Sequence, residues 1–74
     1  MITVVGKQNC QACDTMQAWL NQQGYGYEVI DGMKNMNWMR RIQAHGARSF
    51  PQAFVDGDFI GDLQALQTFL ENNK

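Results

Sequence analysis

The sequence has only two cysteines among its 74 residues, Cys10 and Cys13, and they stand close together. A disulfide between them would close a tiny loop and remove little entropy from the unfolded chain, so it would be a poor structural cross-link. A zinc site needs about four ligands, and the chain adds only His45, so two chains would have to share the metal. A pair of inert buried cysteines remains an alternative, but core packing gives no reason for this spacing.

The chain also lacks an excess of charge of either sign, because six basic residues are balanced by seven acidic ones. Nucleic-acid binding requires a basic face, so no nucleic-acid partner is expected. No apolar run is long enough to cross a membrane, and the start lacks the basic leader and apolar core of a signal peptide. We therefore expect a single domain, residues 1–74, in the cytoplasm, where closely spaced cysteines are more often catalytic or metal-binding than structural.

Short apolar runs and helical periodicity divide the chain into alternating elements. β-Branched and aromatic runs predict strands at residues 2–5, 27–30, 53–55 and 58–60. Apolar residues at helical spacing predict helices that start at Ala12, near Trp38 and at Leu63, and the first two end before Gly24 and Gly46. The order βαβαββα predicts an α/β fold, a four-stranded mixed sheet with helices on both faces.

The cysteine pair opens the first predicted helix, directly after a strand and a short loop. Thiol–disulfide exchange requires a thiolate, and the free N–H groups and dipole of a helix N-terminus favour an anion at Cys10. Lys7 adds a positive charge nearby. We therefore expect Cys10 to be an exposed nucleophile with a lowered thiol pKa. Cys13, one turn further in, is expected to be more buried and to resolve the mixed disulfide.

These features resemble the glutaredoxin family over nearly the whole chain. The matching segments are residues 7–13 with the two cysteines, the Ser-Phe-Pro at 49–51, the hairpin at 55–60, and Gly61-Asp62 before the last helix. The resemblance implies a thioredoxin-like fold with three helices around the sheet. It also implies a dithiol enzyme that reduces protein disulfides or glutathione mixed disulfides, with glutathione as reductant, no metal, and a monomeric state.

The resemblance further implies which residues hold the thiol substrate. Pro51 is expected to be cis, an uncommon state even for proline. This turns the backbone of Phe50 toward Cys10, so that it can pair with an extended thiol peptide. Lys7 and Gln43 match positions that bind the glycyl carboxylate of glutathione.

The start of the last helix matches a second part of the glutathione site, but with departures. Gly61 and Asp62 stand where the family has two glycines, and backbone N–H groups there would receive the γ-glutamyl carboxylate. Asp62 instead brings a carboxylate to this position. Between the cysteines, Gln11 and Ala12 replace the usual Pro-Tyr, and Ala65 replaces an aspartate that contacts the γ-glutamyl amine.

These departures leave two alternatives open. The first is a glutaredoxin-like redoxin reduced by thioredoxin reductase and serving ribonucleotide reductase, although the tryptophan-rich segment expected before the last helix is absent. The second is a dimeric iron–sulfur binding module that uses Cys10 from two chains and two glutathiones.

Overall fold

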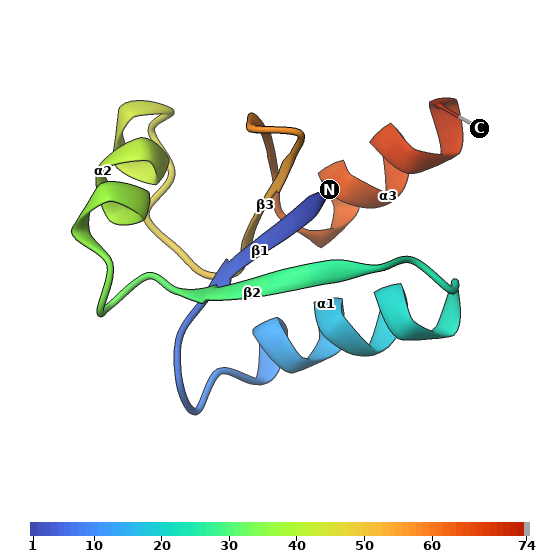
Figure 1. Ribbon diagram of the computed structural model, residues 1–74, viewed down its shortest axis with the longest axis horizontal. Coiled ribbons are helices and arrows are strands. Elements are labelled where there is room, and N and C mark those ends of the chain that lie inside the picture. The colour runs from blue at the N-terminus through green and yellow to red at the C-terminus, as the bar shows by residue number, and fades with distance from the viewer. Residues whose placement is uncertain (74) are drawn as a thin grey trace.

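The computed structural model describes residues 1–73, and its elements follow the predicted order (Figure 1). The strands and helices are β1 (Ile2–Gly6), α1 (Gln11–Gln22), β2 (Tyr27–Asp31), α2 (Met36–Ala44), β3 (Gln52–Val55), β4 (Asp58–Gly61) and α3 (Leu63–Asn72). The βαβαββα order is therefore confirmed, and the boundaries differ only slightly from those that the sequence predicts.

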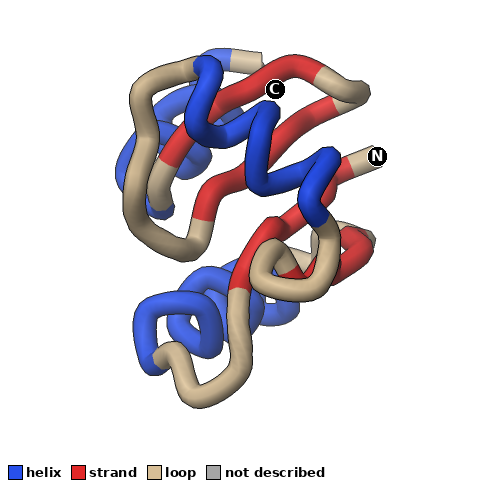
Figure 2. Tube along the Cα trace, turned by 90° about the vertical axis from the view of Figure 1, so that its left-hand side faces the viewer, coloured by secondary structure: helices blue, strands red, loops and turns tan. Residues whose placement is uncertain are grey.

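The four strands form one mixed sheet in the order β2-β1-β3-β4. β1 and β2 are parallel, with Val4 opposite Val29, as a right-handed βαβ unit requires. β3 pairs antiparallel with both β1 and β4, so the hairpin adds the antiparallel half of the sheet. Figure 2 shows the strands running between helices. β1 is therefore central, and its carboxyl end leads directly into the loop that carries Cys10.

The two faces of the sheet are covered by different helices, as predicted. One face carries a buried cluster from β1, β3, α1 and α3, made of Ile2, Val4, Met16, Leu20, Ala53 and Leu66. The other face carries a smaller cluster in which Val5 and Phe54 of the sheet meet Ile42 of α2. Alternation along β1, with Val4 facing one layer and Val5 the other, follows from the two-residue period of a strand.

An arginine and several aromatic side chains attach α2 to the β3–β4 hairpin. The guanidinium carbon of Arg41 lies 4.2 Å from the ring centre of Trp38 and 4.8 Å from that of Phe54. Its Nη2 also donates a 2.7 Å hydrogen bond to the carbonyl oxygen of Gly57 in the hairpin turn. His45, which caps the end of α2, stacks on Phe59 at 4.5 Å. These contacts add to the small apolar cluster on this face.

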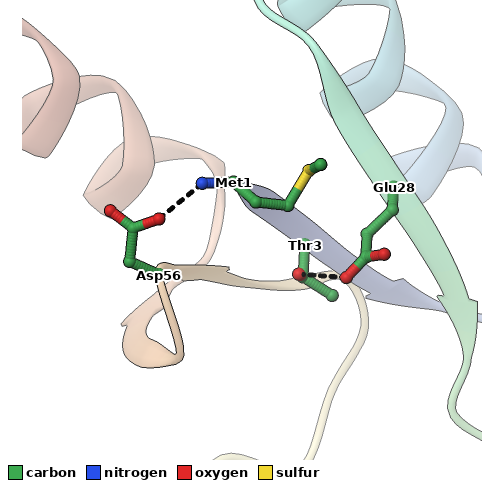
Figure 3. Close-up of polar contacts among 4 residues, drawn as sticks. All are labelled: Met1, Thr3, Glu28 and Asp56. Carbon is green, nitrogen blue, oxygen red and sulfur yellow. Dashed lines mark hydrogen bonds and ion pairs between the residues drawn. The ribbon is translucent and has the colours of Figure 1, made fainter.

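Polar contacts join β1 to its neighbours on both sides (Figure 3). The amine of Met1 forms an ion pair with Asp56 in the hairpin turn. Buried Thr3 donates a 2.8 Å hydrogen bond from Oγ1 to Glu28 Oε1 of β2.

No helix within residues 1–73 is long and apolar enough to cross a membrane.

Candidate active site

The two cysteines lie at the N-terminus of α1. Cys10 is the N-cap residue, with an extended backbone, and its Sγ accepts a 3.1 Å hydrogen bond from the Cys13 N–H. Cys10 and Cys13 form a disulfide with a Cα–Cα separation of 5.2 Å, within the usual range of roughly 4.4–6.8 Å. A sulfur atom therefore occupies the place that a serine or aspartate oxygen takes in an ordinary helix cap.

The burial of the two sulfurs differs from the prediction in one respect. Cys13 is more buried than Cys10, as expected, with 2% against 8% of the residue exposed. Cys10 itself is nevertheless buried rather than exposed, and its Sγ is bonded to Cys13 Sγ. Gly6 makes room for the pair, since a Cβ at this position would lie 3.0 Å from Cys13 Sγ.

The loop that lines a hollow together with Ala12 and Thr15 of α1 contains a cis peptide bond between Phe50 and Pro51, as predicted. Gln52, only 5% exposed, holds this loop. Its Nε2 donates a 2.9 Å hydrogen bond to the carbonyl oxygen of Ser49. The ring of Phe50 packs on Gly32, where a Cβ would lie 2.6 Å from Phe50 Cε1. The buried Gln52 amide thus holds the loop at Ser49, and Gly32, which has no Cβ, leaves the space in which Phe50 packs.

The N-terminus of α3 is capped by the side chain of Asp62. Asp62 is the N-cap residue, as the sequence predicts, and its Oδ1 accepts a 3.0 Å hydrogen bond from the Ala65 N–H. Gly61, just before it, has a φ of +128°, a backbone conformation that favours glycine. One of the helix N–H groups that a bound carboxylate could use is therefore already bonded to Asp62.

These segments meet around a hollow of about 310 Å³ beside the cysteine motif. It is lined by Ala12, Thr15, Ser49, Phe50, Pro51, Asp62, Leu63 and Gln64. Three of the residues expected at the glutathione site, Phe50, Pro51 and Asp62, are thus brought together next to the start of α1. Their roles in binding remain predictions.

Lys7, Gln11 and Gln43 do not line this hollow. Gln43 lines a larger hollow of about 660 Å³ between α2 and the cis-proline loop, which shares Ser49 and Phe50 with the first. Lys7 lines a third hollow together with Cys13 and Asp31. Gln11 is exposed at the first position of α1. Lys7 and Gln43 therefore line hollows other than the one that Phe50, Pro51 and Asp62 share.

Three residues that shape the site were not singled out from the sequence: Gly6, Gly32 and Gln52. Each acts through a partner distant in sequence, so no local pattern identifies it. The weak signal is that Gly6 ends β1 and Gly32 directly follows β2, because a glycine at a strand often marks a close approach of another segment. Within residues 1–73, no group of three or more His, Cys, Asp or Glu side chains is arranged to hold a metal ion.

Comparisons with known proteins agree with this geometry. The family profile described as Glutaredoxin matches residues 2–60. Buckwheat glutaredoxin, solved as a glutathione complex, superimposes with a TM-score of 0.78 at 22% identity, over 99% of this chain and 70% of that one. The glutaredoxin-like NrdH-redoxin from Escherichia coli gives 0.79 at 16% identity, over 93% and 91%. Glutaredoxin 1 from Francisella tularensis gives 0.73 at 18% identity, over 99% and 96%.

A comparison with curated protein sequences found no match. The family profile spans most of the chain, and the solved structures share its fold. With a Cys-x-x-Cys disulfide at the start of α1 and a cis-proline opposite, the chain belongs to the glutaredoxin family of thiol–disulfide oxidoreductases.

Proposed function

We propose that this protein is a glutathione-dependent dithiol glutaredoxin that reduces protein disulfides and glutathione mixed disulfides. The observation that carries the proposal is the position of Cys10, whose sulfur caps α1 and accepts the Cys13 N–H. When the disulfide is reduced, the same N–H and the helix dipole stabilise a thiolate at this sulfur. Cys10 is therefore the nucleophile, and Cys13, more deeply buried, is the resolving thiol.

The reaction proceeds by two exchanges. The Cys10 thiolate attacks one sulfur of a substrate disulfide, a bond forms between the two sulfurs, and the other substrate sulfur leaves as a thiolate that takes up a proton. Cys13, having lost its proton, then attacks Cys10 Sγ and releases the second substrate thiol. Two electrons pass to the substrate and the Cys10–Cys13 disulfide remains. Two glutathione molecules restore the dithiol and leave as glutathione disulfide.

The hollow beside the cysteines supports a thiol tripeptide as reductant. Phe50 and Pro51 lie opposite the start of α1, and a cis-proline presents the preceding backbone for strand-like pairing. The buckwheat glutaredoxin was solved with glutathione, and we propose the same thiol for this chain. Lys7 and Gln43 then serve as candidates for the glycyl carboxylate. We place the protein in the cytoplasm, where glutathione keeps thiols reduced. We also propose that it is a monomer.

A second candidate function is a redoxin reduced by thioredoxin reductase, with ribonucleotide reductase as a possible client. The bond from the Ala65 N–H to Asp62 favours it, because this donor is no longer available to a glutathione carboxylate. The E. coli NrdH-redoxin, which is described as having a thioredoxin-like activity profile, has the same fold. No comparable observation favours the iron–sulfur module.

The two functions are separated by the reductase that sustains turnover. The protein is given a small glutathione mixed disulfide with NADPH, glutathione and glutathione reductase, or insulin with NADPH and thioredoxin reductase. We expect NADPH oxidation in the first mixture and its loss in Cys10→Ser. Turnover with thioredoxin reductase alone would replace the main proposal by the second. No turnover in either mixture, or full turnover of Cys10→Ser, would contradict both.

A further inference from the structure

A separate hollow between α1 and the end of β2 adjoins the buried cysteine. Its volume is about 230 Å³, and its lining includes Gly6, Lys7, Cys13, Gln17 and Asp31. It shares no lining residue with the hollow beside the cis-proline loop. A space of this size holds several water molecules. Water on this side therefore lies next to Cys13, the residue that has to lose a proton before it can resolve a mixed disulfide.

The missing side chain of Gly6 joins Cys13 to the rest of this hollow. A Cβ at Gly6 would lie 3.0 Å from Cys13 Sγ, so no side chain stands between this part of β1 and the sulfur. Gly6 pairs in register with Asp31 of the parallel strand β2. Residues paired in this way project from the same face of a sheet. The Asp31 side chain therefore leaves β2 on the face that carries Cys13 Sγ.

The Asp31 carboxylate is held in a defined position at this hollow. Its Oδ1 accepts a 2.9 Å hydrogen bond from the Met33 N–H, two residues further along the chain, as aspartate commonly does in a turn. The bond leaves Oδ2 to take up a proton. Within residues 1–73, Asp31 is the only carboxylate in the lining, and Lys7 is the only cation. The Lys7 charge offsets the repulsion between Asp31 and a thiolate that forms at Cys13.

We propose that Asp31, acting through water in this hollow, takes the proton from Cys13 in the step that resolves the mixed disulfide. The inference rests on the proposed thiol–disulfide exchange and adds the destination of the proton. The Cys13 thiolate attacks Cys10 Sγ and a bond forms between these two sulfurs. The bond from Cys10 to the substrate sulfur breaks, and this sulfur leaves as a thiolate with the electron pair. Asp31 then returns its proton to solvent through the same hollow.

The test separates the two exchanges with 5,5′-dithiobis(2-nitrobenzoate), a small disulfide whose released thiolate is yellow. Protein reduced with dithiothreitol and desalted is mixed with it near neutral pH in a stopped-flow instrument. Attack by Cys10 releases the first thiolate at a rate that rises with the reagent concentration, which is increased until this phase outruns the second. Attack by Cys13 releases the second thiolate at a rate that does not depend on this concentration. The second phase therefore measures the step in which Cys13 loses its proton.

Asp31→Asn is the central variant, because asparagine can keep the turn bond to the Met33 N–H but cannot take up the proton. We expect its second phase to slow by about tenfold to a hundredfold, as expected when a positioned proton acceptor is lost. Its first phase should stay close to that of wild type. Asp31→Glu keeps the carboxylate, but its longer side chain does not fit the short turn. It should therefore retain more of the second phase than Asp31→Asn, whereas a purely structural role of the turn would reverse this order.

Glu28→Gln is the matched control. It removes a carboxylate from the same strand that does not line the hollow, and glutamine Oε1 can still accept the bond from Thr3 Oγ1. Both of its phases should match those of wild type. Circular dichroism checks that each variant folds. If Asp31→Asn does not fold, Asp31→Ser provides a second neutral residue that can form a turn of this kind.

Three results would overturn the role of Asp31: an unchanged or faster second phase in Asp31→Asn, a slower second phase in Asp31→Glu than in Asp31→Asn, or an equal slowing in Glu28→Gln. The first phase tests the exchange itself. If the wild-type protein shows no first phase, the proposed function is wrong. A normal first phase with a second phase that does not depend on Asp31 contradicts only the inference about the proton.

Discussion

The starts of α1 and α3 use the same structural device with different chemistry. In each, the N-cap side chain accepts the backbone N–H three residues later: Cys10 Sγ from Cys13 at 3.1 Å, and Asp62 Oδ1 from Ala65 at 3.0 Å. The cap of α1 is a sulfur that can change its bonding, whereas the cap of α3 is a permanent carboxylate. A helix N-terminus can thus activate a nucleophile at one position and fix a charge at another.

The largest expected effect comes from changing the sulfur at the first cap. Cys10→Ser should lower turnover by on the order of a thousandfold or more, because the nucleophile is lost, while serine still caps α1. Cys13→Ser should keep much of its turnover on a glutathione mixed disulfide, since a second glutathione can resolve the intermediate. Both rates are measured with glutathione reductase, and circular dichroism checks that both variants fold. Equal losses in the two variants would contradict the unequal roles of the cysteines.

The next effect concerns the loop that lies between the two helix starts. Gly32→Ala should lower the free energy of unfolding by about 1–3 kcal/mol, because the new Cβ would lie 2.6 Å from Phe50 Cε1. Turnover should fall as well, since Phe50 precedes the cis-proline. Urea unfolding measures the stability.

Gly26→Ala is the matched control for this change. No atom of residues 1–73 outside its chain neighbours lies within 4 Å of a Cβ placed at Gly26. It should therefore be neutral or slightly stabilising. Similar losses in both variants would show that Phe50 does not depend on the space at Gly32.

The smallest effect concerns the Asp62 cap at the start of α3. Asp62→Ala should cost about 1 kcal/mol through loss of the cap, whereas Asp62→Asn should cost little. Asn35 provides a comparison at the start of α2, where it makes no side-chain capping bond within residues 1–73. Asn35→Ala should therefore cost less than Asp62→Ala in the same urea titration. Equal costs at the two positions would mean that the Ala65 bond does not stabilise α3.

The sequence predicted those parts of the molecule that depend on local chemistry. Short segments are enough to predict the strand and helix periods. They also predict the Asp62 cap and the start of α1 at the cysteines. The cis bond at Pro51 was predicted only through the resemblance to glutaredoxins, because an isolated Phe-Pro favours the trans form.

What the sequence missed depends on contacts between distant segments. Cys10 was expected to be exposed, but only 8% of the residue is exposed in the folded chain. Gly32 and Gln52 matter because Phe50 and Ser49 happen to lie against them. Likewise, no periodicity places Arg41 over Trp38 and Phe54. Such contacts become visible only when the sheet brings the segments together.

The most direct test of the central claim asks which sulfur reacts first. The fully reduced protein is treated with less than one equivalent of iodoacetamide near neutral pH, and the labelled peptides are identified by mass spectrometry. Because only Cys10 caps the helix and is the less buried of the pair, we predict that the label lies almost entirely on Cys10. Equal labelling of both cysteines, or preferential labelling of Cys13, would contradict the assignment of Cys10 as the nucleophile.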